Sequence, residues 1–288
     1  MLLRTMNSSP FKHILTFDIE DWFHFIDVPR LNDTTSWHTF PSIVEKNTRQ
    51  ILRILSEGNA KATFFCLGWI AEKYPSLIRE IDIAGHEIAC HSYWHLPVYR
   101  QSRNLFRDET TRTIDILSGI TGKKINGYRA PSFSVINGSE WALEVLIELG
   151  FKYDASIFPA KRRHGGYPSF PNKPTLFIVS EHQSIPELPM SLLRFGALSM
   201  PFSGGGFFRI LPYTFIQKGF HWLERKGIPG IVYLHPRDFD FDFSLPGMEY
   251  LKRFSASCRL LHTEGKIRRL LRDFSFLPCD SWLESFSI

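Results

Sequence analysis

Strand-like and helix-like segments alternate along the first half of this chain, and no other feature restricts its fold as strongly. Short apolar runs rich in β-branched and aromatic residues predict buried strands. Segments between them carry apolar residues at helical spacing. The predicted strands cover residues 13–19, 61–68, 86–92, 125–131 and 151–158, and the predicted helices cover 40–59, 69–85, 104–122 and 138–150. This alternation predicts an α/β fold, with βαβ units around a parallel sheet or barrel.

The second half of the chain is less regular. Residues 159–205 are rich in Pro, Gly and Ser and predict long loops with a short strand at 175–180. A helix is predicted at 211–227, and a last strand at 230–236. No linker or low-complexity tract divides the chain, so we expect a single catalytic domain over 1–288. Its core would span about 13–240, with a C-terminal helical segment at 247–275.

Charge and composition exclude several classes of function. The net charge is +5, but the Lys and Arg residues are scattered and no nucleic-acid motif is visible, so we expect no nucleic-acid partner. No stretch approaches the roughly 20 apolar residues of a membrane span. The N-terminal residues lack the features of a signal peptide, and the four cysteines form no CxxC pair. These features predict reduced thiols and a cytoplasmic location.

Titratable residues follow most of the predicted strands. In βα architectures, functional sites gather at the carboxyl ends of the parallel strands. The chain places there three acids after the first strand, two histidines after the third, and one residue after each of the fourth, fifth and last strands: Asp18, Glu20, Asp21, His91, His95, Arg129, Asp154 and His235. These residue types form a chemically coherent set.

The stretch "HSYWH" is the sharpest local pattern. His91 and His95 are four positions apart, which places them on one face if the segment turns helically. Two imidazoles and one carboxylate are a common ligand set for catalytic zinc, with one position left open for water. The spacing alone is weak, since eleven histidines can give such a pair by chance. The acids at another strand end make a metal site the favoured interpretation.

The same strand ends offer a base and an acid. A carboxylate after the first strand can take a proton from water, and Arg129 is a candidate to keep it ionised. His235, at the end of "IVYLH", is placed to protonate a leaving group.

Four stretches in this order, "TFDIED", "HSYWH", "YRAPSF" and "VYLHP", resemble the polysaccharide deacetylases, the NodB-like carbohydrate esterases of family four. The resemblance covers roughly residues 13–160 and returns near 235. Later segments, "YDASIFP", "PELPMS", "SGGGFFRILPY" and "LHPRDFD", resemble a branch of that family associated with bacterial exopolysaccharide loci.

The resemblance implies a distorted (β/α)7 barrel and metal-dependent hydrolysis of an N-acetyl group on an amino sugar. The sugar would belong to a bacterial polysaccharide or to its lipid-linked or nucleotide-linked precursor, with peripheral contact to a membrane-linked glycan as one possibility. Asp18 would be the base, Arg129 its partner, and His235 the general acid. His91 and His95 would bind the metal, with zinc favoured over cobalt, nickel or manganese.

The chain departs from the family pattern at the metal site. Ile19 stands where the family has a metal-binding Asp directly after the base. Strand alternation turns Ile19 away from Asp18 and brings Glu20 to the same face. Asp21 is the alternative third ligand if the strand ends in a turn.

The surroundings of the site leave further alternatives open. Asp154, Glu187 or Asp238 could orient His235, and His24 could support the metal ligands. "SGGGFFR" lacks the GK[ST] ending of a phosphate-binding loop, so we expect a flexible or tightly turning loop near the cleft there. The expected substrate-binding residues are three aromatic side chains beside the motifs and one arginine: Trp22, Trp94, Phe133 and Arg209.

Two other functions compete with deacetylation. One is an amide hydrolase on the same scaffold, either metal-independent or directed at a formyl group, which metal content and chelator sensitivity would distinguish. The other is a non-catalytic sugar-binding module, whose expected mark is loss of the base or of a metal-binding histidine. Asp18, His91 and His95 are all present, which favours an enzyme.

Overall fold

A curled, mainly parallel sheet forms the centre of the protein. The computed structural model describes residues 11–26, 28, 31, 33–196, 198–240 and 263–286. The main sheet has the order β10-β1-β2-β3-β4-β5-β7-β6, with β11 also paired to β1. Its strands are β1 (Lys12–Ile19), β2 (Thr63–Cys66), β3 (Glu87–Cys90), β4 (Gly127–Tyr128), β5 (Tyr153–Asp154), β6 (Thr175–Ser180), β7 (Gln183–Glu187), β10 (Ile231–Leu234) and β11 (Ser275–Leu277).

Every pairing in this sheet is parallel except that of β6 with β7. The predicted α/β barrel-like class is confirmed. The path from β10 to β6 holds one strand more than the seven expected, because β6 folds back on β7 as a hairpin. A separate two-stranded sheet is formed by β8 (Leu192–Phe195) and β9 (Leu198–Pro201).

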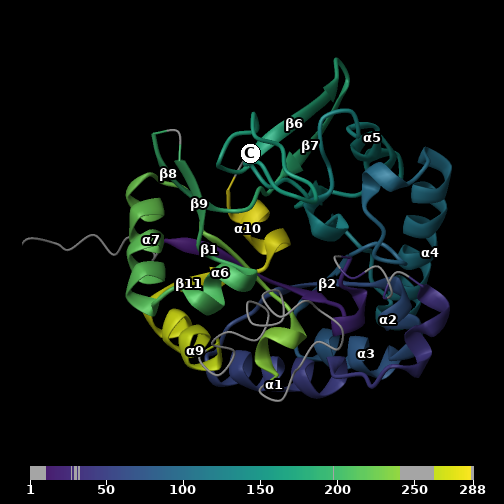
Figure 1. The fold of residues 1–288 in the computed structure, drawn as a ribbon, viewed down its shortest axis with the longest axis horizontal. Helices are drawn as coiled ribbons and strands as arrows, with labels where there is room; N and C mark the ends of the chain where they lie inside the picture. Colours follow the sequence, from purple (N-terminus) through teal and green to yellow (C-terminus); the bar gives the residue numbers. More distant parts are fainter. Residues whose placement is uncertain are drawn as a thin grey trace, which may run out of the picture.

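Helices surround the outer face of the sheet (Figure 1). Most follow a strand and return the chain to the next one, as the sequence pattern predicts. They are α1 (Val44–Glu57), α2 (Gly68–Lys73), α3 (Pro75–Ile83), α4 (Arg103–Thr121), α5 (Trp141–Glu148), α6 (Gly205–Ile210), α7 (Tyr213–Arg225), α9 (Thr263–Asp273) and α10 (Cys279–Ser285), with short 3-10 turns η1 (Trp22–His24), η3 (Thr34–Thr39), η4 (Val98–Arg100), η5 (Pro131–Phe133) and η6 (Pro236–Phe239).

Strand β1 divides its side chains between two layers. Leu15, Phe17 and Ile19 belong to the core cluster between the sheet and the outer helices. Ile14 belongs to a second cluster, inside the curl of the sheet. Since successive side chains of a strand alternate between its faces, Asp18 lies on the same inner face as Ile14, at the opposite end of the strand.

The inner cluster closes the amino-terminal end of the barrel. Trp282 and Cys279 of α10 are buried in it with Ile14. Trp282 Nε1 also donates a hydrogen bond to the Lys12 carbonyl, at 3.1 Å. The helix therefore fills one end of the barrel with apolar side chains, and the polar site lies at the other end.

Each predicted strand is observed. Strand β1 starts one residue earlier than predicted and β6 matches its predicted range, while the others are shorter than expected. Strands β4 and β5 contain two residues each, where 125–131 and 151–158 had been predicted. The predicted helical segment at 247–275 is observed as α9 from Thr263, and its residues before 263 lie outside the described residues.

Candidate active site

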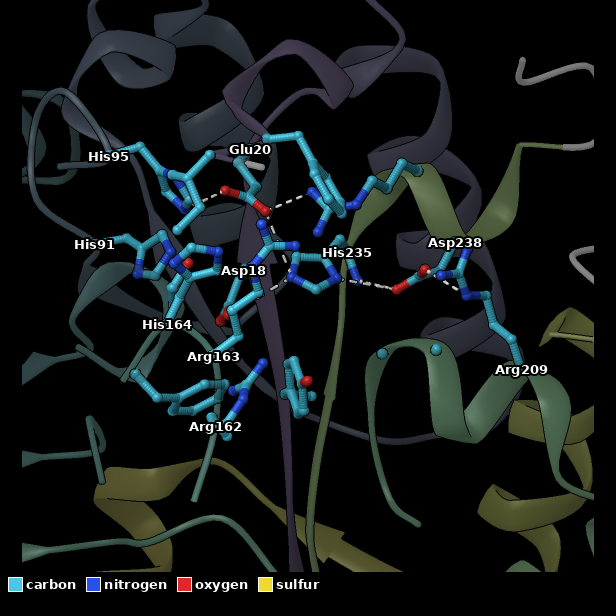
Figure 2. A pocket seen from close by; sticks show the side chains of 18 residues that line it. Asp18, Glu20, His91, His95, Arg162, Arg163, His164, Arg209, His235 and Asp238 are labelled. Carbon is cyan, nitrogen blue, oxygen red and sulfur yellow. Dashed lines mark hydrogen bonds and ion pairs between the residues drawn. The ribbon is translucent and has the colours of Figure 1, made fainter. Parts of the chain in front are cut away.

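A pocket of about 270 Å³ lies beyond the carboxyl ends of β1, β3 and β10. Parallel pairing explains the location, since these strand ends meet at one edge of the sheet. Figure 2 shows the side chains that line it. They are Asp18, Glu20, Phe25, Ile26, His91, His95, Ser132, Phe133, Arg162, Arg163, His164, Gly205, Gly206, Arg209, Tyr233, His235, Arg237 and Asp238.

Asp18 forms a buried ion pair with Arg129. Arg129 Nη1 donates to Asp18 Oδ1 at 2.7 Å, and the arginine side chain is fully buried. Burial opposes ionisation of Asp18, but interactions led by the charge and hydrogen bond of Arg129 outweigh it and hold the pKa of Asp18 below its ordinary value. Asp18 is therefore an ionised carboxylate that can accept a proton from a group in the pocket.

Glu20, His91 and His95 bring their ligand atoms together. One atom from each lies within 4.8 Å of the others, and all three side chains are buried. His91 Nδ1 contacts the Arg129 carbonyl at 2.7 Å, and only a protonated Nδ1 can donate to that oxygen. Burial lowers the pKa of His91 to about 4, so the ring is neutral and its Nε2 lone pair is available.

The segment between the two histidines is a loop, which corrects the expected helical turn. Ser92 and His95 both have positive φ angles, of 66° and 56°. Gly68 N donates to the Ser92 carbonyl at 2.8 Å and anchors the loop against α2. The two imidazoles meet, with ring centres 5.3 Å apart, through backbone reversal and not through helical periodicity.

The donor set fits a divalent metal. Glu20 Oε2 and His95 Nδ1 are buried atoms with no hydrogen-bond partner among the described residues. Glu20 Oε2 lies 2.5 Å from His95 Nε2, shorter than a normal N–H···O bond. One carboxylate and two imidazoles with an open side toward a pocket match the ligands of catalytic zinc sites.

Asp21 has a structural role, which corrects its place among the expected ligands. Its carboxylate accepts hydrogen bonds from Ser42 Oγ at 2.5 Å and from the Trp22 backbone N–H at 2.9 Å. The backbone N–H groups of Ile43 and Val44 also donate to it. The side chain thus joins η1 to the start of α1 and does not contribute to the metal-ligand cluster.

His235 is held by Asp238. His235 Nδ1 contacts Asp238 Oδ2 at 3.1 Å, while its Nε2 faces Glu20 Oε1 at 3.4 Å and Asp18 Oδ2 at 3.9 Å. Burial opposes ionisation of Asp238, but the charge of Arg209 lowers its pKa below the ordinary value. Of the three acids that the sequence offered as partners of His235, Asp238 is the one in contact.

Helix α6 aims Arg209 at Asp238, at 3.3 Å. Two glycines allow the helix to approach β10 closely. A Cβ on Gly204 would lie 2.0 Å from the Tyr233 ring, and Gly205 has a φ of 51° with the Tyr233 hydroxyl 2.8 Å from its Cβ position. Gly204 caps α6 and Gly205 and Gly206 form its first turn, which corrects the loop expected from the sequence. Arg209, on the same helix, has an acidic partner beside the pocket.

The carboxyl end of α6 is fixed by a buried lysine of α9. Lys266 Nζ donates to the carbonyl oxygens of Phe208, Arg209 and Leu211, at 3.0, 2.7 and 2.8 Å. A lysine at this position satisfies carbonyls that have no partner within the helix. The C-terminal part of the chain therefore helps to place Arg209.

Asp154 supports Arg129 and not His235. Ser156 Oγ donates to Asp154 Oδ1 at 2.5 Å and accepts from the Ala130 backbone N–H at 2.7 Å. Burial raises the pKa of both Asp154 and its hydrogen-bonded neighbour Glu187. This corrects the expectation that Asp154 could orient His235, since it lies beside the segment that carries Arg129.

Of the four residues expected to bind substrate, two line the pocket and two do not. Phe133 and the arginine Arg209 line the pocket as predicted. Trp22 and Trp94 do not line it, which corrects their assignment to the substrate. Trp22 is buried and donates to the Pro41 carbonyl at 2.9 Å, and Trp94 packs against Trp37. Apolar packing explains both side chains.

His24 lies behind the ligand cluster. Its Nδ1 accepts from the Asp21 backbone N–H at 2.8 Å, and its ring centre is 6.3 Å from that of His95.

Four titratable pocket residues were not among the expected site residues: Arg162, Arg163, His164 and Arg237. Arg237 Nη1 contacts Glu20 Oε1 at 2.5 Å. The only sequence signal for Arg237 was its position two residues after His235, and for the others a short cluster of basic residues.

Two family models match the chain. Residues 29–153 match the model described as polysaccharide deacetylase. Residues 155–284 match a domain of unknown function, DUF3473. The central sheet runs through both regions, because β2, β3 and β4 lie in the first match and β6, β7 and β10 lie in the second. Asp18 and Glu20 precede the first match, and His235 lies in the second.

Curated relatives share part of this region. A peptidoglycan-N-acetylglucosamine deacetylase of Bacillus cereus is 35% identical over 98 residues, covering 34% of this chain and 36% of that protein. A peptidoglycan deacetylase of Helicobacter pylori is 29% identical over 108 residues, covering 38% and 36%. The matched part therefore spans about a third of the length of these relatives.

Solved structures share the fold over nearly the whole chain. A Mycobacterium smegmatis protein assigned to the polysaccharide deacetylases has a TM-score of 0.63 at 22% identity, covering 96% of this chain and 91% of the other. The allantoinase PuuE has a TM-score of 0.61 at 16% identity, with the same coverage. Within the described residues, no helix is both long and apolar enough to cross a membrane.

Proposed function

We propose that this chain, which carries a polysaccharide deacetylase domain matched over residues 29–153, is a metal-dependent hydrolase that removes an N-acetyl group from an amino sugar. The sugar would belong to a bacterial polysaccharide or to its lipid-linked or nucleotide-linked precursor. The observation that carries the proposal is a single pocket in which an ionised carboxylate, a cluster of metal-ligand atoms and a histidine–carboxylate pair face one another.

Glu20, His91 and His95 would hold the metal, which we infer to be zinc, with cobalt, nickel or manganese as substitutes. A metal bound there supplies Lewis-acid polarisation of the acetyl oxygen and makes a water molecule more acidic.

The protein's own side chains would move the protons. Asp18 takes a proton from the attacking water, and Arg129 keeps that carboxylate ionised and fixed in direction. His235 gives a proton to the sugar nitrogen as its bond to the acetyl carbon breaks, and acetate leaves. Asp238 contacts Nδ1 of His235 and orients the ring so that Nε2 faces the reacting groups.

Replacing the base tests this assignment. Asp18→Asn should lower acetate release by at least about 10²-fold, because the amide cannot accept the proton. Its metal content, measured by elemental analysis of the purified protein, should match that of the wild type. Asp108→Asn, the same change at an exposed position of α4, is the control. Substantial turnover by Asp18→Asn would remove Asp18 from the role of base.

The substrate form can be found by screening. Acetate release would be measured on N-acetylated sugars as polymers, as lipid-linked precursors and as nucleotide sugars, with zinc or cobalt added. Allantoin belongs in the same screen, because an allantoinase shares the fold. Turnover that survives complete metal removal would favour the metal-independent amide hydrolase, and sugar binding without any turnover would favour a binding module.

A further inference from the structure

A basic segment, residues 159–167, forms one wall of the pocket and takes no part in the proposed chemistry. Arg162, Arg163 and His164 line the pocket from this segment, and Figure 2 shows them on the side away from Asp238. We call residues 159–167 the basic arm. The sequence holds no Asp or Glu between residues 155 and 174, so the arm has no acidic neighbours along the chain.

The acids of the pocket are already matched by other arginines. The three carboxylates that line it are Asp18, Glu20 and Asp238. Their arginine partners are Arg129 at 2.7 Å, Arg237 at 2.5 Å and Arg209 at 3.3 Å, respectively. Arg162 of the basic arm therefore adds positive charge to a pocket whose acids each have another arginine beside them.

Arg162 is placed by aromatic rings and not by an acid. Its guanidinium lies 4.5 Å from the ring centre of Phe158 and 5.3 Å from that of Phe133. Among the described residues, no carboxylate lies within ion-pair distance of Arg162. Stacking holds the plane of a guanidinium and leaves N–H groups along its edge available to a ligand.

The backbone of the arm is fixed before any ligand binds. Gly166 N donates to the Phe133 carbonyl at 3.3 Å, and Tyr167 N donates to the Phe158 carbonyl at 2.8 Å. Gly165 has a φ of 99°, and a Cβ there would lie 2.2 Å from the Phe133 carbonyl oxygen. Only glycine permits this close approach, so the arm is held against the pocket at little entropic cost on binding.

We propose that the basic arm is an anion subsite, and that the sugar deacetylated here carries a phosphate or carboxylate group on or beside the N-acetylated residue. Arg162 binds this group through its planar N–H edge, which matches both kinds of oxyanion. The proposal rests on the proposed deacetylase function for the identity of the reacting group. The electrostatic preference for an anion rests on the arm alone.

Matched substrates test the subsite on the full-length, zinc-loaded protein. Acetate release would be compared for N-acetylglucosamine, N-acetylglucosamine 1-phosphate and N-acetylmuramic acid. At least one anionic sugar should have a kcat/KM about tenfold or more above that of the neutral sugar, since hydrogen bonds between charged groups are the stronger kind. Comparison of the phosphate sugar with the carboxylate sugar identifies which anion is preferred.

Arg162→Ala and Arg162→Gln should remove that preference, mainly through a higher KM for the anionic sugars, and should lower kcat/KM much less for the neutral sugar. Arg162→Lys should keep part of the preference. Lys161→Ala is the matched control, because it removes the same charge from an exposed position of the arm that does not line the pocket. Equal kcat/KM for all three sugars, or an equal loss on all of them in the Arg162 variants, would overturn the subsite.

Binding separates this proposal from the proposed function. The affinity of the full-length Asp18→Asn protein for N-acetylglucosamine 1-phosphate and for N-acetylglucosamine would be measured by calorimetry, with and without Arg162→Gln. Tighter binding of the phosphate sugar that depends on Arg162, together with no acetate release from any sugar by the wild-type protein, would support the subsite and contradict the deacetylase. Acetate release without any anion preference in affinity or turnover would support the deacetylase and contradict the subsite.

Discussion

Four consecutive residues at the end of β1, 18–21, have different environments, because the backbone direction decides which side chains reach the pocket. Asp18 and Glu20 point into the pocket, Ile19 packs under the outer helices, and Asp21 caps η1. Alternation along the strand predicts the first three from the sequence. The role of Asp21 could not be predicted, because it depends on hydrogen bonds from Ser42 and Ile43, which only the folded chain brings near.

We predict opposite effects for two neighbouring substitutions. Glu20→Gln should lose bound metal while leaving the metal-free protein folded, since the amide is a poor ligand. Asp21→Asn should retain metal but lower the free energy of unfolding by about 1–3 kcal/mol, because its amide group would face backbone donors in a buried site. Metal analysis and urea unfolding of both variants check this.

The wild type and each single variant would be measured after identical metal removal and reloading. Loss of metal from Asp21→Asn at unchanged stability would return Asp21 to the ligand set and displace Glu20 from it.

Elements that carry the site were predicted where an apolar run or a helical period marks them. Strand β1 and helix α7 were predicted from such patterns alone. The loop that joins His91 to His95 did not follow its four-residue spacing, because contacts with α2 hold Ser92 and His95 in left-handed conformations. The order of residues along the chain could not show this local reversal.

We predict that the glycines at the start of α6 differ in their tolerance of a methyl group: Gly206 tolerates one and Gly204 does not. Gly204→Ala should lower the free energy of unfolding by about 1–3 kcal/mol, because its Cβ would overlap the Tyr233 ring. It should also lower kcat, since α6 would shift and weaken the contact of Arg209 with Asp238.

Gly206→Ala is the control for that change. Its Cβ would meet only Arg209 Nη2, at 3.7 Å, so its stability should equal or exceed that of the wild type. Chemical unfolding and acetate release measured on both variants compare the two positions. Equal losses would mean that the close approach of α6 to β10 does not determine the placement of Arg209.

At the scale of the whole molecule, parallel topology made the site partly predictable. Once the strands are parallel, residues at their carboxyl ends must gather at one edge, so Asp18, His91, Arg129 and His235 could be grouped from the sequence. The basic arm could not, because 155–174 has neither period nor motif, and its approach to the pocket depends on contacts with Phe133.

The opposite end of the barrel should make overall stability depend on pH. Glu87, at the start of β3, is half-buried and accepts hydrogen bonds from Thr63 Oγ1 at 2.5 Å and Tyr153 Oη at 2.7 Å. Burial, and next the charge of Asp280, raise the pKa of Glu87 from 4.5 to about 8. Between these values the folded protein holds a proton that the unfolded chain releases.

We therefore predict that this carboxyl makes the free energy of unfolding fall as pH rises from about 4.5 to 8, by at most about 1.4 kcal/mol per pH unit. Glu87→Gln, which imitates the protonated acid, should flatten that part of the curve and be more stable than wild type near pH 8. Denaturant unfolding at several pH values checks the difference, with exposed Glu181→Gln as control. An unchanged slope would mean that Glu87 is ionised in the folded protein.

The position of β1 between strands from opposite ends of the chain has a consequence for synthesis. Arg237 and Glu20, which touch in the pocket, are 217 positions apart. A nascent chain that ends before β10 already holds the proposed base, its arginine and all three proposed metal ligands, yet one edge of β1 has no partner. Such an edge can pair with another chain. Strand β10 and the proposed general acid His235 are therefore synthesised together. A chain released before them would be both inactive and prone to aggregate.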